Sequence, residues 1–126
     1  MSFETSFVTW LKANVPLVTN RIYAVIAPQD ITQPYLVYTL ISAPRAYSHS
    51  GVSGIVEARY QINICADSYA TTKSIAKQLR DALSGYRGAI GTETVYSAFC
   101  DTELDSHDDN SELYVSISDY MISYKE

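Results

Sequence analysis

Residues 56–64, VEARYQINI, alternate apolar and polar side chains without interruption. The apolar members are Val56, Ala58, Tyr60, Ile62 and Ile64, and the polar members between them are Glu57, Arg59, Gln61 and Asn63. A repeat of two residues places these sets on opposite faces of an extended chain. The stretch therefore predicts a β-strand with one face in the core, and the rest of the fold is built around it.

A second strand is expected immediately upstream. Residues 35–41, YLVYTLI, are rich in aromatic and β-branched side chains, which favour strands. Both faces of this segment are apolar, which is typical of a central strand or of one covered by a neighbouring subunit. Residues 44–54, PRAYSHSGVSG, contain Pro44, Gly51 and Gly54 and are interpreted as a flexible connection. The two strands are thus predicted to form a long hairpin with a mobile tip.

Two amphipathic helices are also expected. The first covers residues 2–13, with Ser2 as its N-cap. Its apolar face comprises Phe3, Phe7, Trp10 and Leu11. The second covers about residues 68–84, with Asp67 as N-cap and Gly85 just beyond its end. Its apolar face comprises Ile75, Ala76, Leu79, Ala82 and Leu83, and its solvated face comprises Lys73, Lys77 and Arg80.

A second hairpin closes the chain. Glu93–Cys100 and Leu113–Tyr124 are predicted strands, joined by an acidic connection at residues 101–112. A short extended piece is expected at residues 21–26. The order α-ββ-α-ββ predicts an α+β fold: an antiparallel sheet of about four strands with two helices packed on one face. The length fits one domain, residues 1–126.

The composition is that of a globular protein. Of the 126 residues, 47% are hydrophobic and 18% are charged, which is unlike the apolar-poor composition of disordered chains. No apolar run approaches the roughly 18 residues that a membrane span needs, and no export signal is visible at the N-terminus. Cys65 and Cys100 are too few for a disulfide framework, so we expect reduced thiols in a cytoplasmic chain.

Charge is unevenly distributed along the chain. The net charge is -5, and residues 92–126 contain nine Asp/Glu against a single Lys/Arg. The sequence has no cluster of Lys and Arg that could neutralise phosphates. Tight nucleic-acid binding is therefore not expected.

The acidic run can be compared with a calcium-binding loop. Asp101, Glu103, Asp105, Asp109 and Glu112 fall at positions 1, 3, 5, 9 and 12 of an EF-hand loop, with His107 at position 7. Position 6 is Ser106, whereas the sharp turn there calls for glycine, and the flanking segments are predicted strands. Two interpretations remain: these carboxylates form a weak metal site in a calcium-dependent interaction module, or they keep a hairpin tip soluble.

Catalytic motifs are absent from the sequence. There is no G-x-S-x-G elbow, and the five glycines are too scattered for a phosphate loop or a dinucleotide fingerprint. His49 and His107 lie in predicted loops without zinc-ligand spacing to Cys65 or Cys100. The sequence predicts a non-enzymatic protein without a cofactor. An enzyme with an unrecognised concave site is the remaining alternative.

Tyrosine is the unusual component, because it supplies 11 of the 15 aromatic residues. Tyr and Arg are enriched at interface cores, where they bury a large area and keep a polar tip. The candidate interface residues are Tyr35, Tyr38, Arg45, Tyr47, His49, Tyr114, Tyr120 and Tyr124. The alternative is that the tyrosines complete one small core.

Several short sequence segments, taken in their order along the chain, resemble the phage tail completion or tail terminator proteins. This family includes the head-to-tail joining proteins of long-tailed phages. The first phrases are Asn20-Arg21-Ile22-Tyr23, Ala27-Pro28-Gln29, Pro34-Tyr35-Leu36-Val37-Tyr38 and Tyr47-Ser48-His49-Ser50-Gly51. The later ones are Ala58-Arg59-Tyr60-Gln61-Ile62-Asn63-Ile64-Cys65-Ala66, Ser68-Tyr69-Ala70 and Leu113-Tyr114-Val115-Ser116-Ile117-Ser118-Asp119-Tyr120. One departure is Ala24-Val25-Ile26, where a proline is expected soon after the Arg-Ile-Tyr phrase.

The resemblance implies a structural virion protein that forms a homo-oligomeric, usually hexameric, ring at the head-proximal end of the tail tube. Such a ring binds tail tube protein, stops tube polymerisation and offers the docking face for a head-closure or connector protein. DNA passes through the lumen without specific binding, and the family implies no catalytic residue and no membrane. The alternative within the same assembly is a different head–tail connector, such as a head-closure component of the neck.

Overall fold

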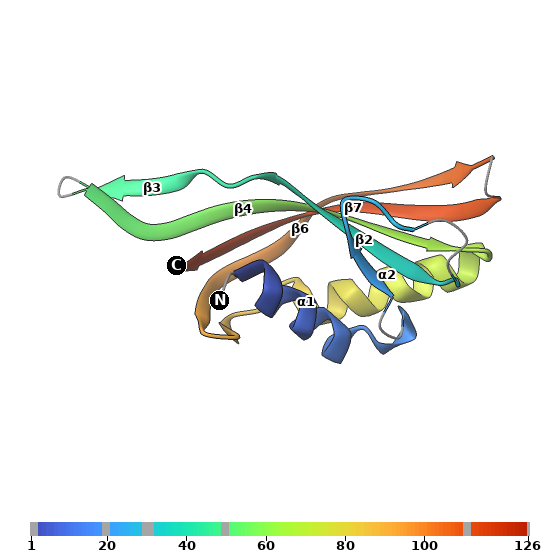
Figure 1. Ribbon diagram of the computed structural model, residues 1–126, viewed down its shortest axis with the longest axis horizontal. Coiled ribbons are helices and arrows are strands. Elements are labelled where there is room, and N and C mark those ends of the chain that lie inside the picture. The colour runs from blue at the N-terminus through green and yellow to red at the C-terminus, as the bar shows by residue number, and fades with distance from the viewer. Residues whose placement is uncertain (1–2, 19–20, 29–31, 49–50, 110–111, 126) are drawn as a thin grey trace.

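The computed structural model describes residues 3–18, 21–28, 32–48, 51–109 and 112–125. Its elements are the helices α1 (Phe3–Asn14) and α2 (Tyr69–Leu83), a 3-10 turn (Pro16–Val18), and the strands β1 (Ile22–Ala24), β2 (Tyr35–Ser42), β3 (Arg45–Ser48), β4 (Gly51–Ala66), β5 (Gly88–Ile90), β6 (Glu93–Asp108) and β7 (Leu113–Lys125). They occur in the chain in that numerical order, with α1 first and α2 between β4 and β5 (Figure 1).

The strands form one seven-stranded mixed sheet. Its order is β1-β2-β4-β7-β6-β5, and β3 pairs with β4 outside this path. β1 runs parallel to β2, whereas the other neighbours are antiparallel. The expectation of an antiparallel sheet of about four strands is therefore wrong. β1 lies within the short extended piece expected at residues 21–26, which was not counted as a strand of the sheet, and β5 was not expected. Each has three residues, which is too short to show an alternating pattern.

The other differences arise where predicted loops are strands. Within the segment 44–54, β3 pairs with the beginning of β4, and this two-stranded ribbon extends beyond the rest of the sheet (Figure 1). The acidic segment also continues as strand, because β6 runs to Asp108 and pairs with β7 along its length. The glycines of segment 44–54 and the charged residues of segment 101–112 suggested loops. Strands also accept glycine and charged residues at the ends and edges of a sheet.

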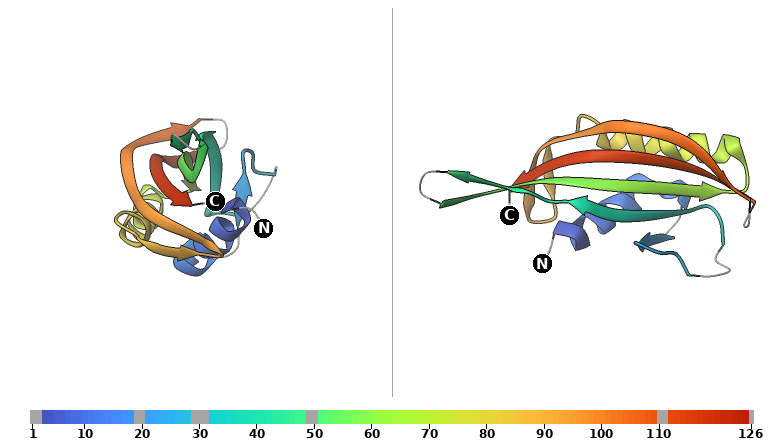
Figure 2. Two further views of the ribbon diagram at one scale, coloured as in Figure 1. Left: turned by 90° about the vertical axis from the view of Figure 1, so that its left-hand side faces the viewer. Right: turned by 90° about the horizontal axis from the view of Figure 1, so that it is seen from above.

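Both helices lie on the concave side of the strongly curved sheet (Figure 2). The N-cap of α2 is Ser68, not Asp67, and it makes no side-chain capping hydrogen bond. Gly85 follows the helix with φ +85° and donates its backbone N–H to the carbonyl oxygen of Ala98 at 2.6 Å. The helix therefore ends in the left-handed residue expected there and is joined to β6 at once. Ser2, the expected N-cap of α1, lies outside the described residues.

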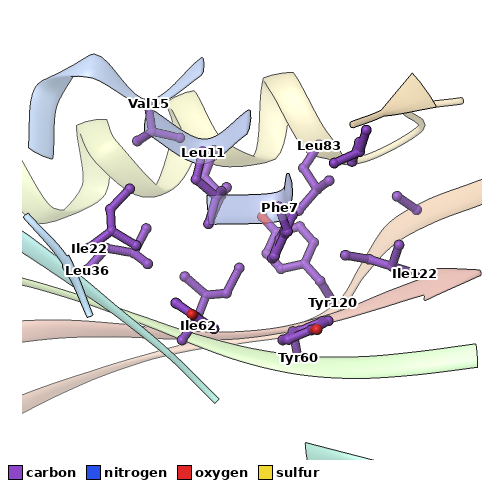
Figure 3. Close-up of a cluster of buried hydrophobic side chains, with 14 of the residues drawn as sticks. Phe7, Leu11, Val15, Ile22, Leu36, Tyr60, Ile62, Leu83, Tyr120 and Ile122 are labelled. Atoms are coloured by element: carbon purple, nitrogen blue, oxygen red, sulfur yellow. The ribbon is translucent and has the colours of Figure 1, made fainter. Parts of the chain in front are cut away.

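The core lies between the helices and the concave face, and it is dominated by aromatic packing from α1. Phe7 of α1 is completely buried and packs on Tyr60 of β4, with ring centroids 5.2 Å apart (Figure 3). The five apolar residues of the alternating stretch, Val56 to Ile64, are all buried, as the period-two pattern predicts. On β7, buried Ser116 and Ser118 alternate with half-buried residues, and these small side chains let α2 approach the sheet.

Candidate docking surfaces

The described tyrosines divide into a buried and an accessible group. Tyr38, Tyr120 and Tyr124 are buried, with 6%, 1% and 7% of their surfaces exposed, and they belong to the core. Tyr35 is half-buried on β2, and Tyr114 is exposed near the start of β7. Of these five candidate tyrosines, only the last two offer side-chain surface to a partner in the folded monomer.

Two of the remaining candidate residues lie on the β3–β4 ribbon. Arg45 and Tyr47 belong to β3. Their side chains, and His49 as a whole, lie outside the described part of the structure. The backbone alone shows that the ribbon extends beyond the body of the domain. Only β3 pairs with the residues of β4 that precede Ile55, because the β4–β7 pairing begins there.

Burial changes the acidity of the inner tyrosines. Desolvation raises the pKa of Tyr60 and of Tyr120 well above the usual range, since both hydroxyls lie among core side chains. Desolvation, together with the neighbouring Cys65, raises the pKa of Tyr35 to about 12. These phenols therefore stay neutral at physiological pH and contribute packing instead of charge.

Both cysteines are free thiols: Cys65 is buried and Cys100 is half-buried. Burial raises the pKa of each, which favours the unreactive thiol over the thiolate.

The acidic residues of β6 lie on two different faces. Asp101 accepts a hydrogen bond from Arg59 at 2.9 Å, and the same guanidinium donates to Asp119 of β7 at 3.1 Å. Arg59 alternates with the core residues of β4, so this ion cluster is on the convex face of the sheet. A register shift in β6 at this position, between Cys100 and Thr102, accompanies the cluster.

The next two carboxylates turn the other way and fasten α2 to β6. Arg80 of α2 donates to Glu103 at 2.7 Å, and Lys73 lies 3.6 Å from Glu103 and 3.1 Å from Asp105. Lys73 and then the hydroxyl of Tyr69 donate to Asp105, which lowers the pKa of that carboxyl. The face of α2 that was expected to be solvated is thus paired in part with β6.

An aromatic and acidic surface lies where α2 begins and β6 ends. Tyr69 is 49% exposed and contacts Tyr114 edge to face, with centroids 5.9 Å apart. His107 also packs on Tyr114, with ring centroids 4.8 Å apart, and its Nδ1 lies 3.0 Å from a carboxylate oxygen of Asp109. We call Tyr69, Tyr114, His107 and Asp109 the aromatic end. It lies at the opposite end of the long axis from the β3–β4 ribbon (Figure 1).

The residues compared with a calcium loop are not arranged as one. Asp101 is engaged on the convex face, whereas Glu103 and Asp105 are engaged by α2, so the strand separates them. Asp109 and Glu112 lie beyond the end of β6, each beside His107. Among the residues that the structure describes, no group of three or more His, Cys, Asp or Glu could hold a metal ion.

The convex face of the sheet is not covered by either helix. Phe99 and Leu104 of β6 are 47% and 54% exposed there, beside half-buried Met121 and Ile117 of β7. The Arg59 ion cluster lies between apolar side chains, and the mixture of apolar residues with an arginine is typical of a contact surface.

Sequence reasoning missed the exposed apolar residues Val25 and Ile26. Leu40 and Ile41 are also exposed, and they belong to the segment 35–41 whose two apolar faces the sequence already indicated. The segment Ala24-Val25-Ile26 is unusual in the sequence, because a proline is expected there. That these side chains are exposed depends on the backbone conformation, which the sequence does not reveal. Within the described segments, neither helix is long and apolar enough to cross a membrane.

The chain is similar to proteins of known family and fold. The family model described as "Tail completion protein gp17" matches residues 7–125. A solved chain from the "Virion of native gene transfer agent (GTA) particle" matches with a TM-score of 0.68 and 15% identity, covering 99% of this chain and 92% of that one. Another solved chain matches with a TM-score of 0.61 and 14% identity, covering 98% and 90%. Identities this low establish a shared fold only. No curated protein matches the chain.

Proposed function

The chain belongs to the tail completion protein gp17 family, and from this we propose that it forms a ring at the head-proximal end of a phage tail tube. Family membership makes it a structural component of the phage tail and of the virion. In the proposed role the ring, hexameric in our proposal, stops polymerisation of the tube protein and presents the interface on which the head docks. The family match over residues 7–125 is the observation that carries this proposal.

The surfaces of the monomer support a role in assembly. A closed ring needs heterologous contacts, in which one patch of a subunit meets a different patch of the next. The chain offers several unlike patches: the β3–β4 ribbon, the convex sheet face with Phe99 and Leu104, and the aromatic end.

The two ends of the long axis support contacts with two different partners. The β3–β4 ribbon lies at one end and the aromatic end at the other (Figure 1). In a ring with its subunits side by side, one such end would contact tube protein and the other would contact the head-closure or connector protein. At the aromatic end, Tyr69 donates to Asp105 and packs on Tyr114. His107 packs on Tyr114 and lies beside Asp109, so this end combines rings with carboxylates.

The acidic charge fits a channel through which DNA passes. Residues 92–126 carry nine Asp/Glu against one Lys/Arg, and the tip of the β6–β7 hairpin includes Asp109 and Glu112. Carboxylates facing a lumen would repel phosphates and prevent DNA from adhering. A ring with this tip on its outer wall would contradict this part of the proposal.

Mass and tube length together test the proposal. The purified chain is analysed by light scattering coupled to size exclusion, alone and with its tube protein, and tube lengths are measured by electron microscopy. We expect ring-sized particles, or a monomer that becomes a ring on tube ends, and shorter tubes as more of the chain is added. Lys77→Ala is the matched control, because Lys77 is 67% exposed and pairs with Asp81 on the same helix.

A chain that stays monomeric and leaves tube length unchanged would contradict the proposed role. Binding to the portal complex instead of to tube ends would favour the alternative, a head-closure component of the neck.

A further inference from the structure

The backbone immediately after β1 adopts a strained conformation. Val25 has φ +67°, a left-handed value that β-branched residues rarely adopt. The N–H of Ile26 donates to the carbonyl oxygen of Ala24 at 2.7 Å, which closes a three-residue turn around Val25. Such a turn with a positive φ at its centre is rare and strained. The N–H of Val25 donates to the carbonyl oxygen of Tyr38 at 2.8 Å, which attaches the turn to β2.

The strained turn presents apolar side chains to solvent. Val25 is 70% exposed and Ile26 is 78% exposed. β1 runs parallel to β2 with Ala24 opposite Tyr38, and Leu40 and Ile41, which are 45% and 50% exposed, follow Tyr38 on β2. We call Val25, Ile26, Leu40 and Ile41 the apolar ridge.

In an isolated subunit the ridge is unfavourable in two ways, because the turn is strained and its side chains are hydrated. Strain of this kind usually persists where it serves a function.

A pocket of complementary chemistry lies on another part of the same chain. Its volume is about 360 Å³, and its lining is mostly apolar. The lining residues are Thr5, Ser6, Thr9, Trp10 and Ala13 of α1 together with Gly91. Gly91 has φ +64°, and a Cβ at this position would overlap the side chain of Ser6, so only glycine lets this turn close on α1. The volume lies within the roughly 300–1,000 Å³ that is typical of binding pockets.

The ridge and the pocket lie on different elements of the domain. The ridge belongs to the β1–β2 edge of the sheet, and the pocket includes the turn after β5, the strand at the other end of the sheet order. A ridge and a pocket on different parts of one chain form a heterologous contact when copies meet, and such contacts make a ring when the rotation between copies closes. Neither set contains a charged residue.

We infer that the apolar ridge of one subunit docks into the α1 pocket of the next copy of this chain, with Ile26 as the inserted side chain. The inference rests on the proposed ring and specifies its subunit contact. The ridge then becomes buried, and the favourable burial offsets the strain at Val25.

Disulfide trapping tests the contact directly. Ile26→Cys and Ala13→Cys are combined in one chain and oxidised, and we expect a ladder of covalent multimers that ends at the ring size. Each single variant is the matched control for the native thiols, because it keeps Cys65 and Cys100 and lacks one half of the new pair. Single variants should stay uncrosslinked.

A charge exchange provides the second test. Ile26→Asp and Ala13→Lys should each reduce ring formation at least about tenfold at a fixed concentration, as expected for an interface hot spot. Together they should restore most of it, because the new carboxylate and ammonium groups then face each other. Rings that form normally in both single variants, or a double-cysteine chain without the ladder, would overturn the inference.

Two further outcomes distinguish this contact from the proposed function. Ridge variants that form rings normally but fail to cap tubes would assign the ridge to the tube protein and overturn the inference. A wild-type chain that never forms rings, even with tube protein present, would reject the proposed function itself.

Discussion

Phe3 and Tyr124 stack with their ring centroids 3.9 Å apart and their planes 9° from parallel, which fastens the first turn of α1 to the last strand of the sheet. Phe3 also stacks on Phe7, so the pair connects the N-terminal helix to the centre of the core. Both rings are buried. The two ends of the described chain therefore depend on each other, although they are far apart in the sequence.

Phe3→Ala should destabilise the fold by about 3–5 kcal/mol, because it removes a buried aromatic ring and leaves a cavity against Tyr124. The free energy of unfolding is measured from urea titration. Tyr96→Ala is the control, since Tyr96 is 42% exposed, and it should change stability by less than about 0.5 kcal/mol. Equal effects of the two substitutions would show that α1 is not packed as described.

Arg59→Gln should destabilise the protein more than Lys77→Ala does. Arg59 separates two carboxylates, Asp101 and Asp119, which would repel each other without it, whereas Lys77 has a single exposed partner. Adding Asp119→Asn to Arg59→Gln should recover part of the loss, and urea unfolding of the four combinations measures the coupling. Additive effects would mean that the cluster does not act as a unit.

Acid should loosen the attachment of β6 to α2. The pKa of Asp105 is lowered from its ordinary value of 3.8 by Lys73 and Tyr69. The stabilisation is therefore present above pH 3.8 and is lost as the pH falls through the lower pKa of the folded state. The effect is about 0.5–1 kcal/mol at most, because the side chains are accessible to water.

Asp105→Asn provides the comparison. The free energy of unfolding of wild type and of Asp105→Asn is measured between pH 7 and pH 2. Wild type should lose stability as the pH falls just below the ordinary carboxylate pKa, and Asp105→Asn should lack this part of the loss. Indistinguishable pH profiles for Asp105→Asn and wild type would contradict the assignment.

The parts of the fold with strong periodicity could be predicted from the sequence. The alternation from Val56 to Ile64 identifies β4 and its buried face, and the helical spacing from Ile75 to Leu83 identifies α2. Segments without periodicity could not be predicted. A run of charges such as that near Asp105 occurs in loops and on exposed strand edges alike, so composition does not distinguish them.

The docking surfaces were less predictable than the fold. The alternation in β7 places Tyr114, Tyr120 and Tyr124 on one face, but only the positions of the two helices decide that Tyr120 and Tyr124 are core residues. The exposure of Val25 and Ile26 had no sequence signal beyond an unusual phrase. This exposure follows from the positive φ of Val25, which tertiary contacts impose on the chain. Local sequence propensity contains no information about those contacts.

Val25→Gly should separate stability from assembly. Glycine adopts φ +67° without strain, so the substitution removes about 1–3 kcal/mol of strain. It adds about 0.5–1 kcal/mol of backbone entropy cost. The monomer should therefore become more stable by up to about 2 kcal/mol in urea unfolding. Ring formation should nevertheless decrease, because the exposed isopropyl group is lost from the apolar ridge.

Val25→Ala distinguishes the two causes, because alanine shortens the side chain but keeps the Cβ that is strained at positive φ. It should reduce ring formation as Val25→Gly does, without the gain in monomer stability. If Val25→Gly is more stable and assembles as well as wild type, the strain has no connection with docking. If Val25→Gly is less stable than wild type, the turn is not strained. The physical reason for placing an interface at Val25 and Ile26 then disappears.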